Sequence, residues 1–438
     1  MASSASSTRS ADYYPAPEFP DQSGPLPGKD IVLCFDGTAS RFGHSRPSNV
    51  LKLYQMLSRD SEQINYYQPG IGTYIGSESD DSISSKYRSF LLALDSVIAY
   101  SFDDHIIAGY RFLLRYFSAG DRIWLFGFSR GAFTARVLAS LVSCVGILDR
   151  GGEELVPCAW EIYKNWEAHG TPEDPRCRAT ALVNDFKRSF ASQMPDVYFL
   201  GLWDSIDSVG LLRNRNFLKS ARAATLHLRH ALSIDERRST FRHSSIATLN
   251  HKSSRHSEDN SGYWFPTEDE NENDVVERWF PGNHGDVGGG CWPREDERGL
   301  PQLADVSLLW MVYEARALGL SFADDAIAAL SSRSSSTSTR DIIAAKAHDM
   351  LSFTRDKGKG RATALKWWAI ELLPWPYVVV QRDGRQQRKW APNLGRRRKI
   401  PGNATMHWAV KVKTEGDAGY RPRNVPASVR FEGVSGAV

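Results

Sequence analysis

Cysteines are few in this sequence. There are five, an odd number, and no two stand in C-x-x-C spacing. A disulfide framework and a structural zinc site both need paired or clustered cysteines, so neither is expected. A reducing compartment fits this usage best, and we expect a cytoplasmic protein. The five are Cys34, Cys144, Cys158, Cys177 and Cys291.

A long uncharged apolar run and a strong charge of one sign are also missing. The longest apolar stretch, residues 364–380, contains Lys366, Glu371, Pro374 and Pro376, so it falls short of the roughly 18 uncharged residues that a membrane span needs. The net charge is +3, from 54 basic and 51 acidic residues, and implies no nucleic-acid partner. We expect no cofactor and no resident metal ion.

Strand and helix patterns alternate along much of the chain. With 41% hydrophobic and 24% charged residues, the 438-residue chain has an ordinary globular composition. Short apolar runs predict buried strands at 31–35, 123–126, 197–203 and 278–280. Apolar residues at helical spacing predict helices at 103–117, from the residues after Ser129 to Val145, and at 306–318. The alternation predicts an α/β fold of the α/β-hydrolase type, a mostly parallel sheet with helices on both faces.

One short motif carries chemistry. Residues 127–131 read Gly-Phe-Ser-Arg-Gly and match G-x-S-x-G, the nucleophile elbow. The motif lies between a predicted strand and a predicted helix, which is the context that pushes the hydroxyl of Ser129 out above a sheet. The pentapeptide alone is weak evidence, because a glycine-rich helix start has the same pattern. In this context it predicts that Ser129 is a catalytic nucleophile.

A hydrolase serine also needs a histidine base and a carboxylate, in the chain order Ser, Asp, His. Asp204 and His284 each follow a predicted strand, as Ser129 does, so the three side chains could meet at one sheet edge. The fallback pair is Asp286 with His407. Asp286 could instead bind the backbone of its own glycine-rich loop or a cation.

Stabilisation of a developing oxyanion needs backbone N–H donors. The N–H of Arg130 follows the nucleophile, and a second donor would come from the loop after the first strand, where Gly37 and Thr38 are the candidates. Asp36, just before them, could hold that loop by accepting backbone hydrogen bonds. A plain turn is the alternative meaning of these residues.

Four ordered motifs resemble one known family: residues 32–38, 127–132, 201–205 and 280–290. It is the α/β-hydrolase family typified by the catalytic domain of type VI secretion phospholipase effectors, with many fungal members. The resemblance spans about residues 29–320 and implies hydrolysis of phospholipid acyl esters, with Ser129, Asp204 and His284 as the catalytic triad. The family usually has a serine at the position of Gly285 and often a threonine at that of Ser205.

These observations divide the chain into three parts. Residues 1–28, rich in Ser and Pro and without the apolar segment of a secretory signal, are expected to be a disordered leader. Residues 29–320 form the expected catalytic domain, with a mobile insertion at about 251–274. Residues 321–438 are expected to be a helical or irregular extension, including a Ser/Thr-rich linker at 331–339, that acts as a lid or cap.

The extension contains two segments with more than one interpretation. Trp367 and Trp368 belong either to a lid or lipid-contacting surface or to a buried helix. The basic run 396–399 either attracts anionic headgroups at a membrane surface or is simply solvated.

The expected activity is therefore a serine esterase or phospholipase acting on a lipid or small ester. One alternative is a non-catalytic interaction protein that retains the fold. The other is a metal-dependent aspartyl phosphatase, because residues 35–38 resemble that family's motif. Its nucleophilic aspartate would fall at the position of Cys34.

Overall fold

The computed structural model describes residues 28–37, 46–70, 102–169, 176–206, 225–242, 274–290, 302–329, 339–354, 360–380 and 386–432. Three segments predicted from the sequence are not among these residues. The leader up to residue 27, the insertion at 251–273 and the Ser/Thr tract at 331–338 lie outside the described part.

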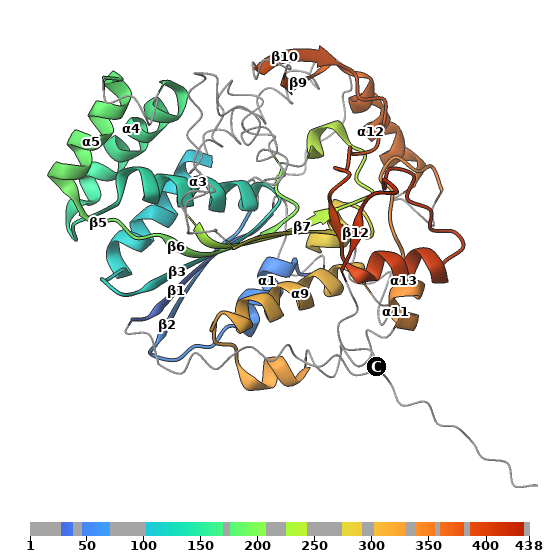
Figure 1. Cartoon of the computed structure of the whole chain (residues 1–438), viewed down its shortest axis with the longest axis horizontal. Coiled ribbons are helices and arrows are strands. Elements are labelled where there is room, and N and C mark those ends of the chain that lie inside the picture. Colours follow the sequence, from blue (N-terminus) through green and yellow to red (C-terminus); the bar gives the residue numbers. More distant parts are fainter. Residues whose placement is uncertain are drawn as a thin grey trace, which may run out of the picture.

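An eight-stranded sheet forms the centre of the molecule (Figure 1), and every strand pair in it is parallel. The strand order is β12-β11-β8-β7-β6-β3-β1-β2. The strands are β1 (Asp30–Phe35), β2 (Gln63–Gln68), β3 (Arg122–Phe128), β6 (Val197–Trp203), β7 (Thr225–Ser233), β8 (Asp274–Phe280), β11 (Thr405–Met406) and β12 (Arg430–Phe431).

Helices cover both faces of the sheet, as the sequence predicts (Figure 1). One face carries α1 (Asn49–Met56) and α9 (Leu303–Ala317). The other carries a helix at 102–116, α3 (Arg130–Val145), α4 (Val156–His169) and α5 (Arg178–Phe190). A 3-10 turn, η1 (Gly152–Leu155), and a small antiparallel pair, β4 (Ile147–Leu148) with β5 (Ala191–Gln193), lie among the latter helices.

Alternation along the strands produces two cores. In β1, Ile31 and Leu33 pack in the cluster with α3, whereas Val32 and Cys34 pack in the cluster with α1 and α9. Because successive side chains of a strand point to opposite faces, a strand that is buried on both sides reads as a continuous apolar run. This is why the runs at 31–35, 123–126 and 197–203 predicted strands correctly.

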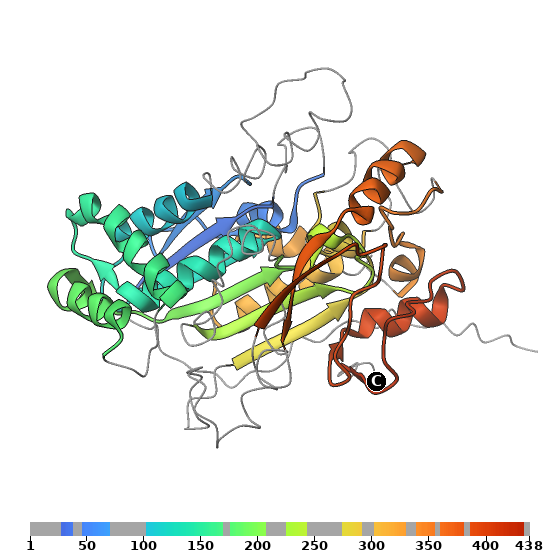
Figure 2. The same cartoon turned by 90° about the horizontal axis from the view of Figure 1, so that it is seen from above.

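The C-terminal elements gather at one end of the sheet (Figure 2). They include α11 (Thr339–Ala344), α12 (Arg361–Leu372), the antiparallel pair β9 (Trp375–Val380) and β10 (Gln386–Ala391), and α13 (Trp408–Gly416). Two short elements link them to the sheet, η2 (Ser239–Phe241) and α8 (His284–Gly288). Within the described ranges, no helix is long and apolar enough to cross a bilayer.

The predicted helices at 103–117 and 306–318 are confirmed within a few residues. The strand predicted at 278–280 is longer, because β8 begins at Asp274 with half-buried residues that give no apolar run. The sequence interpretation missed β2 and β7, which are also partly polar, and the short strands β11 and β12.

Candidate active site

Ser129 occupies a sharp turn between β3 and α3, with φ 59° and ψ −121°. Its backbone N–H donates to the carbonyl of Trp203 on the neighbouring strand β6. A Cβ at Gly127 would lie 2.5 Å from the Cα of Ala132, and one at Gly131 would lie 2.2 Å from a backbone oxygen of β1. The two glycines of the motif are therefore required sterically, since strand, turn and helix pack backbone to backbone here.

Asp204 follows β6, and its side chain is held from β7. Its backbone N–H donates to the carbonyl of Ala231 at 2.7 Å, and its φ is 42°. The N–H of Ser233 donates to Asp204 Oδ1 at 2.9 Å, and the Ser233 hydroxyl donates to Oδ2 at 3.1 Å. The carboxylate is fully buried.

His284 opens the short helix α8, which the side chain of Asn283 caps. Its Nδ1 lies 2.6 Å from Asp204 Oδ2. The imidazole packs on the ring of Phe128 at 4.6 Å between centroids and meets Phe241 edge-on at 4.8 Å. Because Phe128 immediately precedes Ser129, the structure brings His284 to the turn that carries the serine.

A second partner of Asp204 comes from far along the chain. Arg398 donates through Nη1 to Oδ1 at 2.6 Å and through Nη2 to Oδ2 at 3.0 Å. Burial alone would raise the pKa of Asp204. The charge of Arg398 and the hydrogen bonds from His284 and Arg398 outweigh that effect, and the pKa lies well below its ordinary value.

Two opposite charges lie beside His284. Glu236 and Arg238 form a buried ion pair at 2.7 Å, and the charge of Arg238 overcomes burial to lower the pKa of Glu236 to about 2. Burial lowers the pKa of His284, although Asp204 and Glu236 oppose the shift. Burial thus favours the neutral imidazole, the form that a general base requires.

The fallback pair is not brought together. Asp286 Oδ1 lies 2.6 Å from Nδ1 of His348, and its Oδ2 accepts from the N–H groups of His348 and Asn283. Asp286 thus binds the backbone of its own loop. His407 stacks on Phe280 at 4.5 Å, and burial lowers its pKa to about 3.

The predicted oxyanion donors differ in their surroundings. Arg130 is the first residue of α3, where backbone N–H groups point out of the helix N-terminus. The N–H of Gly37 donates to Asp36 Oδ1 at 2.6 Å, so Asp36 does hold the backbone of this loop. Thr38 lies outside the described residues.

Asp36 and Cys34 do not form the arrangement of an aspartyl phosphatase. Asp36 Oδ2 accepts from the hydroxyls of Ser48 and Tyr67 at 2.7 and 2.6 Å. Cys34 is completely buried in the core, where burial raises the pKa of its thiol far above the ordinary value. In the part of the chain that the structure describes, no cluster of His, Cys, Asp or Glu could hold a metal ion.

Sequence reasoning missed Arg398 and Ser233. Arg398 belongs to the basic run 396–399, in which Arg396 and Lys399 are exposed whereas Arg398 is buried. Neither interpretation of the run, headgroup attraction or solvation, describes Arg398. No local signal distinguishes it from its neighbours, because its partner Asp204 is 194 residues away. Ser233 ends a strand that the sequence did not reveal.

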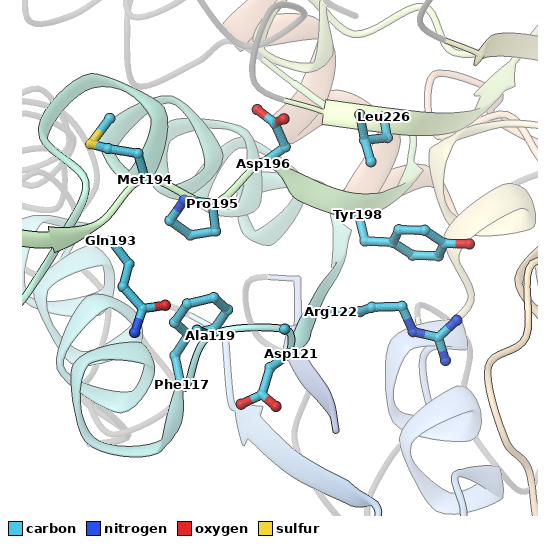
Figure 3. A pocket seen from close by; sticks show the side chains of 11 residues that line it. Phe117, Ala119, Asp121, Arg122, Gln193, Met194, Pro195, Asp196, Tyr198 and Leu226 are labelled. Carbon is cyan, nitrogen blue, oxygen red and sulfur yellow. The ribbon is translucent and has the colours of Figure 1, made fainter. Parts of the chain in front are cut away.

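A pocket of about 380 Å³ lies elsewhere (Figure 3). Its lining includes Arg122 and Asp196, at or just before the first residues of β3 and β6, together with Met194 and Tyr198. Ser129 and Asp204 follow the last residues of the same strands. The pocket is thus at the opposite edge of the sheet from the candidate site, whereas ligands of open α/β sheets bind at the carboxyl ends of the strands.

Fold and site together define the class, an α/β-hydrolase-like protein with a serine turn and a buried Asp–His pair at one sheet edge. Residues 29–314 match the family described as "T6SS, Phospholipase effector Tle1-like, catalytic domain". The chain belongs to this family, and membership supports a hydrolase function of the phospholipase kind. An uncharacterised protein of Saccharomyces cerevisiae is 31% identical over an alignment 564 positions long, which covers 92% of this chain and 81% of the yeast protein.

Solved structures give more distant similarities. An uncharacterised protein from Pseudomonas aeruginosa is 18% identical with a TM-score of 0.36, covering 71% of this chain and 50% of its own. The Tle1 effector bound to the VgrG spike of the type 6 secretion system is 19% identical with a TM-score of 0.31, covering 60% and 52%. The chain thus matches about half the length of each.

Proposed function

We propose that this protein is a serine hydrolase that cleaves carboxylic esters through an acyl-enzyme on Ser129. The observation that carries the proposal is the 2.6 Å contact between Asp204 and His284, buried and packed against the residue before Ser129. A nucleophile elbow with a catalytic triad requires a histidine oriented by a carboxylate beside a strained serine turn, and the contacts of His284 support this assignment.

In the proposed mechanism, His284 takes the proton of Ser129 through Nε2 while Nδ1–H donates to Asp204. The alkoxide attacks the ester carbonyl, and the N–H of Arg130 at the start of α3 donates to the oxyanion. Gly37 or Thr38 supplies the second donor, and the Gly37 N–H must then turn from Asp36. The alcohol leaves with the proton from His284, and water hydrolyses the acyl-enzyme by the same steps.

The substrate class we propose is phospholipid acyl esters, consistent with the family. Helix α12 presents an apolar surface, because Leu365 and Leu372, seven residues apart on one helix face, are 61% and 62% exposed. Trp367 of the same helix meets Phe241 at 5.7 Å, and Phe241 packs on His284. We define Leu365 and Leu372 as the α12 apolar face and propose that it contacts the lipid surface.

Replacing Ser129 with Ala tests the proposal. We expect the variant to lose at least about 1,000-fold in kcat on a short-chain nitrophenyl ester, since the nucleophile is removed. It should retain the wild-type circular dichroism spectrum. Ser189→Ala, at an exposed serine of α5, is the matched control and should be as active as wild type. Turnover by Ser129→Ala at the wild-type rate would exclude the mechanism, and product analysis on mixed phospholipids would identify the bond that is cleaved.

The competing function is a binding protein that keeps the fold without the chemistry. A fluorophosphonate probe separates the two, because it labels only an activated serine. Labelling that disappears in both Ser129→Ala and His284→Gln supports the hydrolase, whereas an unlabelled wild-type chain supports the binding protein.

A further inference from the structure

The carboxylate of Asp204 has a cationic partner as well as a histidine. Its two oxygens accept five hydrogen bonds, two from Ser233, two from Arg398 and one from His284. The pairing with Arg398 is bidentate, and the side chains are 0% and 5% exposed for Asp204 and Arg398. Charge-assisted bidentate pairs of this kind fix both the position and the plane of a carboxylate.

Arg398 is itself held in one orientation. Its Nη1 also donates to the carbonyl and hydroxyl of Ser233 at 3.1 and 2.8 Å, and its Nη2 donates to the carbonyl of Phe241 at 2.6 Å. The guanidinium therefore joins the end of β7 and η2 to Asp204. Since the planar fork of arginine makes these bonds simultaneously, lysine could satisfy the charge but not the geometry.

Arg398 lies outside the part of the chain that matches the family. The family match ends at residue 314, and Arg398 lies 84 residues beyond it. The C-terminal part of the chain thus adds a charged group to the centre of the site that the matched region contains.

We propose that Arg398 is a positioning residue of the hydrolase site, which orients Asp204 toward His284 and sets the pH range in which His284 works as a base. The inference rests on the proposed function of Ser129, Asp204 and His284. Arg398 acts through Asp204 and touches no reacting atom.

The direction of the pH effect follows from the charges that face His284. They are Asp204 after β6, Glu236 and Arg238 after β7, and Arg398 on the far side of Asp204. Asp286, which lies on α8 with His284, instead binds Asn283 and His348. Burial lowers the pKa of His284 from its ordinary value of 6.5, so the acid limb of kcat/KM should lie below pH 6.5. Without Arg398, Asp204 would stabilise the imidazolium more strongly, and the limb should move to higher pH.

Three variants test the proposal. We expect Arg398→Met to lower kcat about 100-fold, since a small displacement of a catalytic group has this effect, and to move the acid limb upward. Arg398→Lys should keep the wild-type acid limb with an intermediate kcat. Arg396→Ala, two residues away and exposed, should match wild type in both. Should Arg398→Met not fold, Arg398→Gln provides the neutral side chain.

A second readout does not depend on turnover. The histidines are labelled with ¹³C at Cε1, His284 is assigned through His284→Gln, and its titration is followed by NMR. An upward shift in the neutral variant, absent in Arg398→Lys, supports the positioning role even if Ser129→Ala were to disprove the esterase mechanism. An unshifted or lowered titration, or an Arg398→Met enzyme with wild-type kcat, would overturn it.

Discussion

Ser129 holds a backbone conformation that side chains rarely adopt, with φ 59° and ψ −121°. Conformations of this kind cost about 1–3 kcal/mol and persist where the surroundings enforce them. Here the close packing of strand, turn and helix at Gly127 and Gly131 is the enforcing structure. The strain is therefore located in the backbone of the residue whose hydroxyl the proposed reaction uses.

Ser129→Gly should relieve this strain. Glycine tolerates positive φ, so we expect the variant to be inactive and more stable than Ser129→Ala by about 1 kcal/mol, after the extra entropy of glycine in the unfolded state is subtracted. The comparison is made by denaturant unfolding of the two variants, neither of which has the hydroxyl. A Ser129→Gly protein no more stable than Ser129→Ala would show that the turn stores no more strain than the entropic cost of glycine, about 0.5–1 kcal/mol.

At the scale of single residues, the sequence predicts those site residues that can be identified from their immediate neighbours in the chain. Ser129 could be found because its tight strand-to-helix turn requires glycines two residues away on each side, and His284 because it follows an apolar run at a glycine-rich turn. His348, which pairs with Asp286, and Arg398, which pairs with Asp204, could not be found. Each becomes informative only once the fold brings its distant carboxylate into contact.

At the scale of elements, Glu371 connects three segments around the site. Its Oε1 accepts from the N–H and hydroxyl of Ser239 in η2 at 2.6 and 2.8 Å. Its Oε2 accepts from Asn393 at 2.7 Å and from the N–H of Gly395 at 3.3 Å. Glu371 therefore holds α12, η2 and the segment that leads to Arg398 in one arrangement.

Glu371→Ala should weaken that arrangement. The substitution leaves four donors without their acceptor, and we expect a loss of about 3 kcal/mol in the free energy of unfolding. Leu372→Ala, at the next and exposed position, should change it by less than about 0.5 kcal/mol. Chemical denaturation measures both. Equal stabilities of the two variants would mean that the hydrogen bonds of Glu371 contribute nothing net.

Strands could be predicted from the sequence where every side chain is apolar and buried. Strand β7 was missed because Arg229 interrupts its apolar pattern, and the structure pairs that buried arginine with Asp274 and Glu314. Strands β11 and β12 are two residues long, too short to show a periodicity of their own. Strand β11 takes its register from β8, and β12 takes its register from β11. Such segments are fixed by tertiary contacts rather than by local pattern.

At the scale of the whole molecule, the region after the family match continues the structure that precedes it. Strand β11 pairs with β8 through Met406 and Trp279, and Arg398 reaches Asp204 across 194 residues. Helix α12 also reaches the site, because its Trp367 meets Phe241, which packs on His284, whereas the α12 apolar face of Leu365 and Leu372 is exposed. The same segments thus supply the charge inside the site and the apolar surface outside it.

The proposed catalysis and the proposed lipid contact can be tested separately, by comparing a soluble substrate with a vesicle substrate. In the double variant Leu365→Asp with Leu372→Asp, we expect hydrolysis of a soluble nitrophenyl ester to stay within about twofold of wild type, because both side chains are on the surface. Hydrolysis of anionic phospholipid vesicles should fall at least about tenfold, since two carboxylates would replace apolar area at the membrane surface and repel its charge.

Leu182→Asp on α5 is the matched control, an exposed leucine on a helix at the other end of the molecule from α12 (Figure 1). It should leave both activities unchanged. If the double variant lost both activities equally, α12 would support the site rather than the lipid contact. If Leu182→Asp reduced vesicle hydrolysis as strongly, added negative charge anywhere on the surface would explain the effect, and the α12 apolar face would have no special part in it.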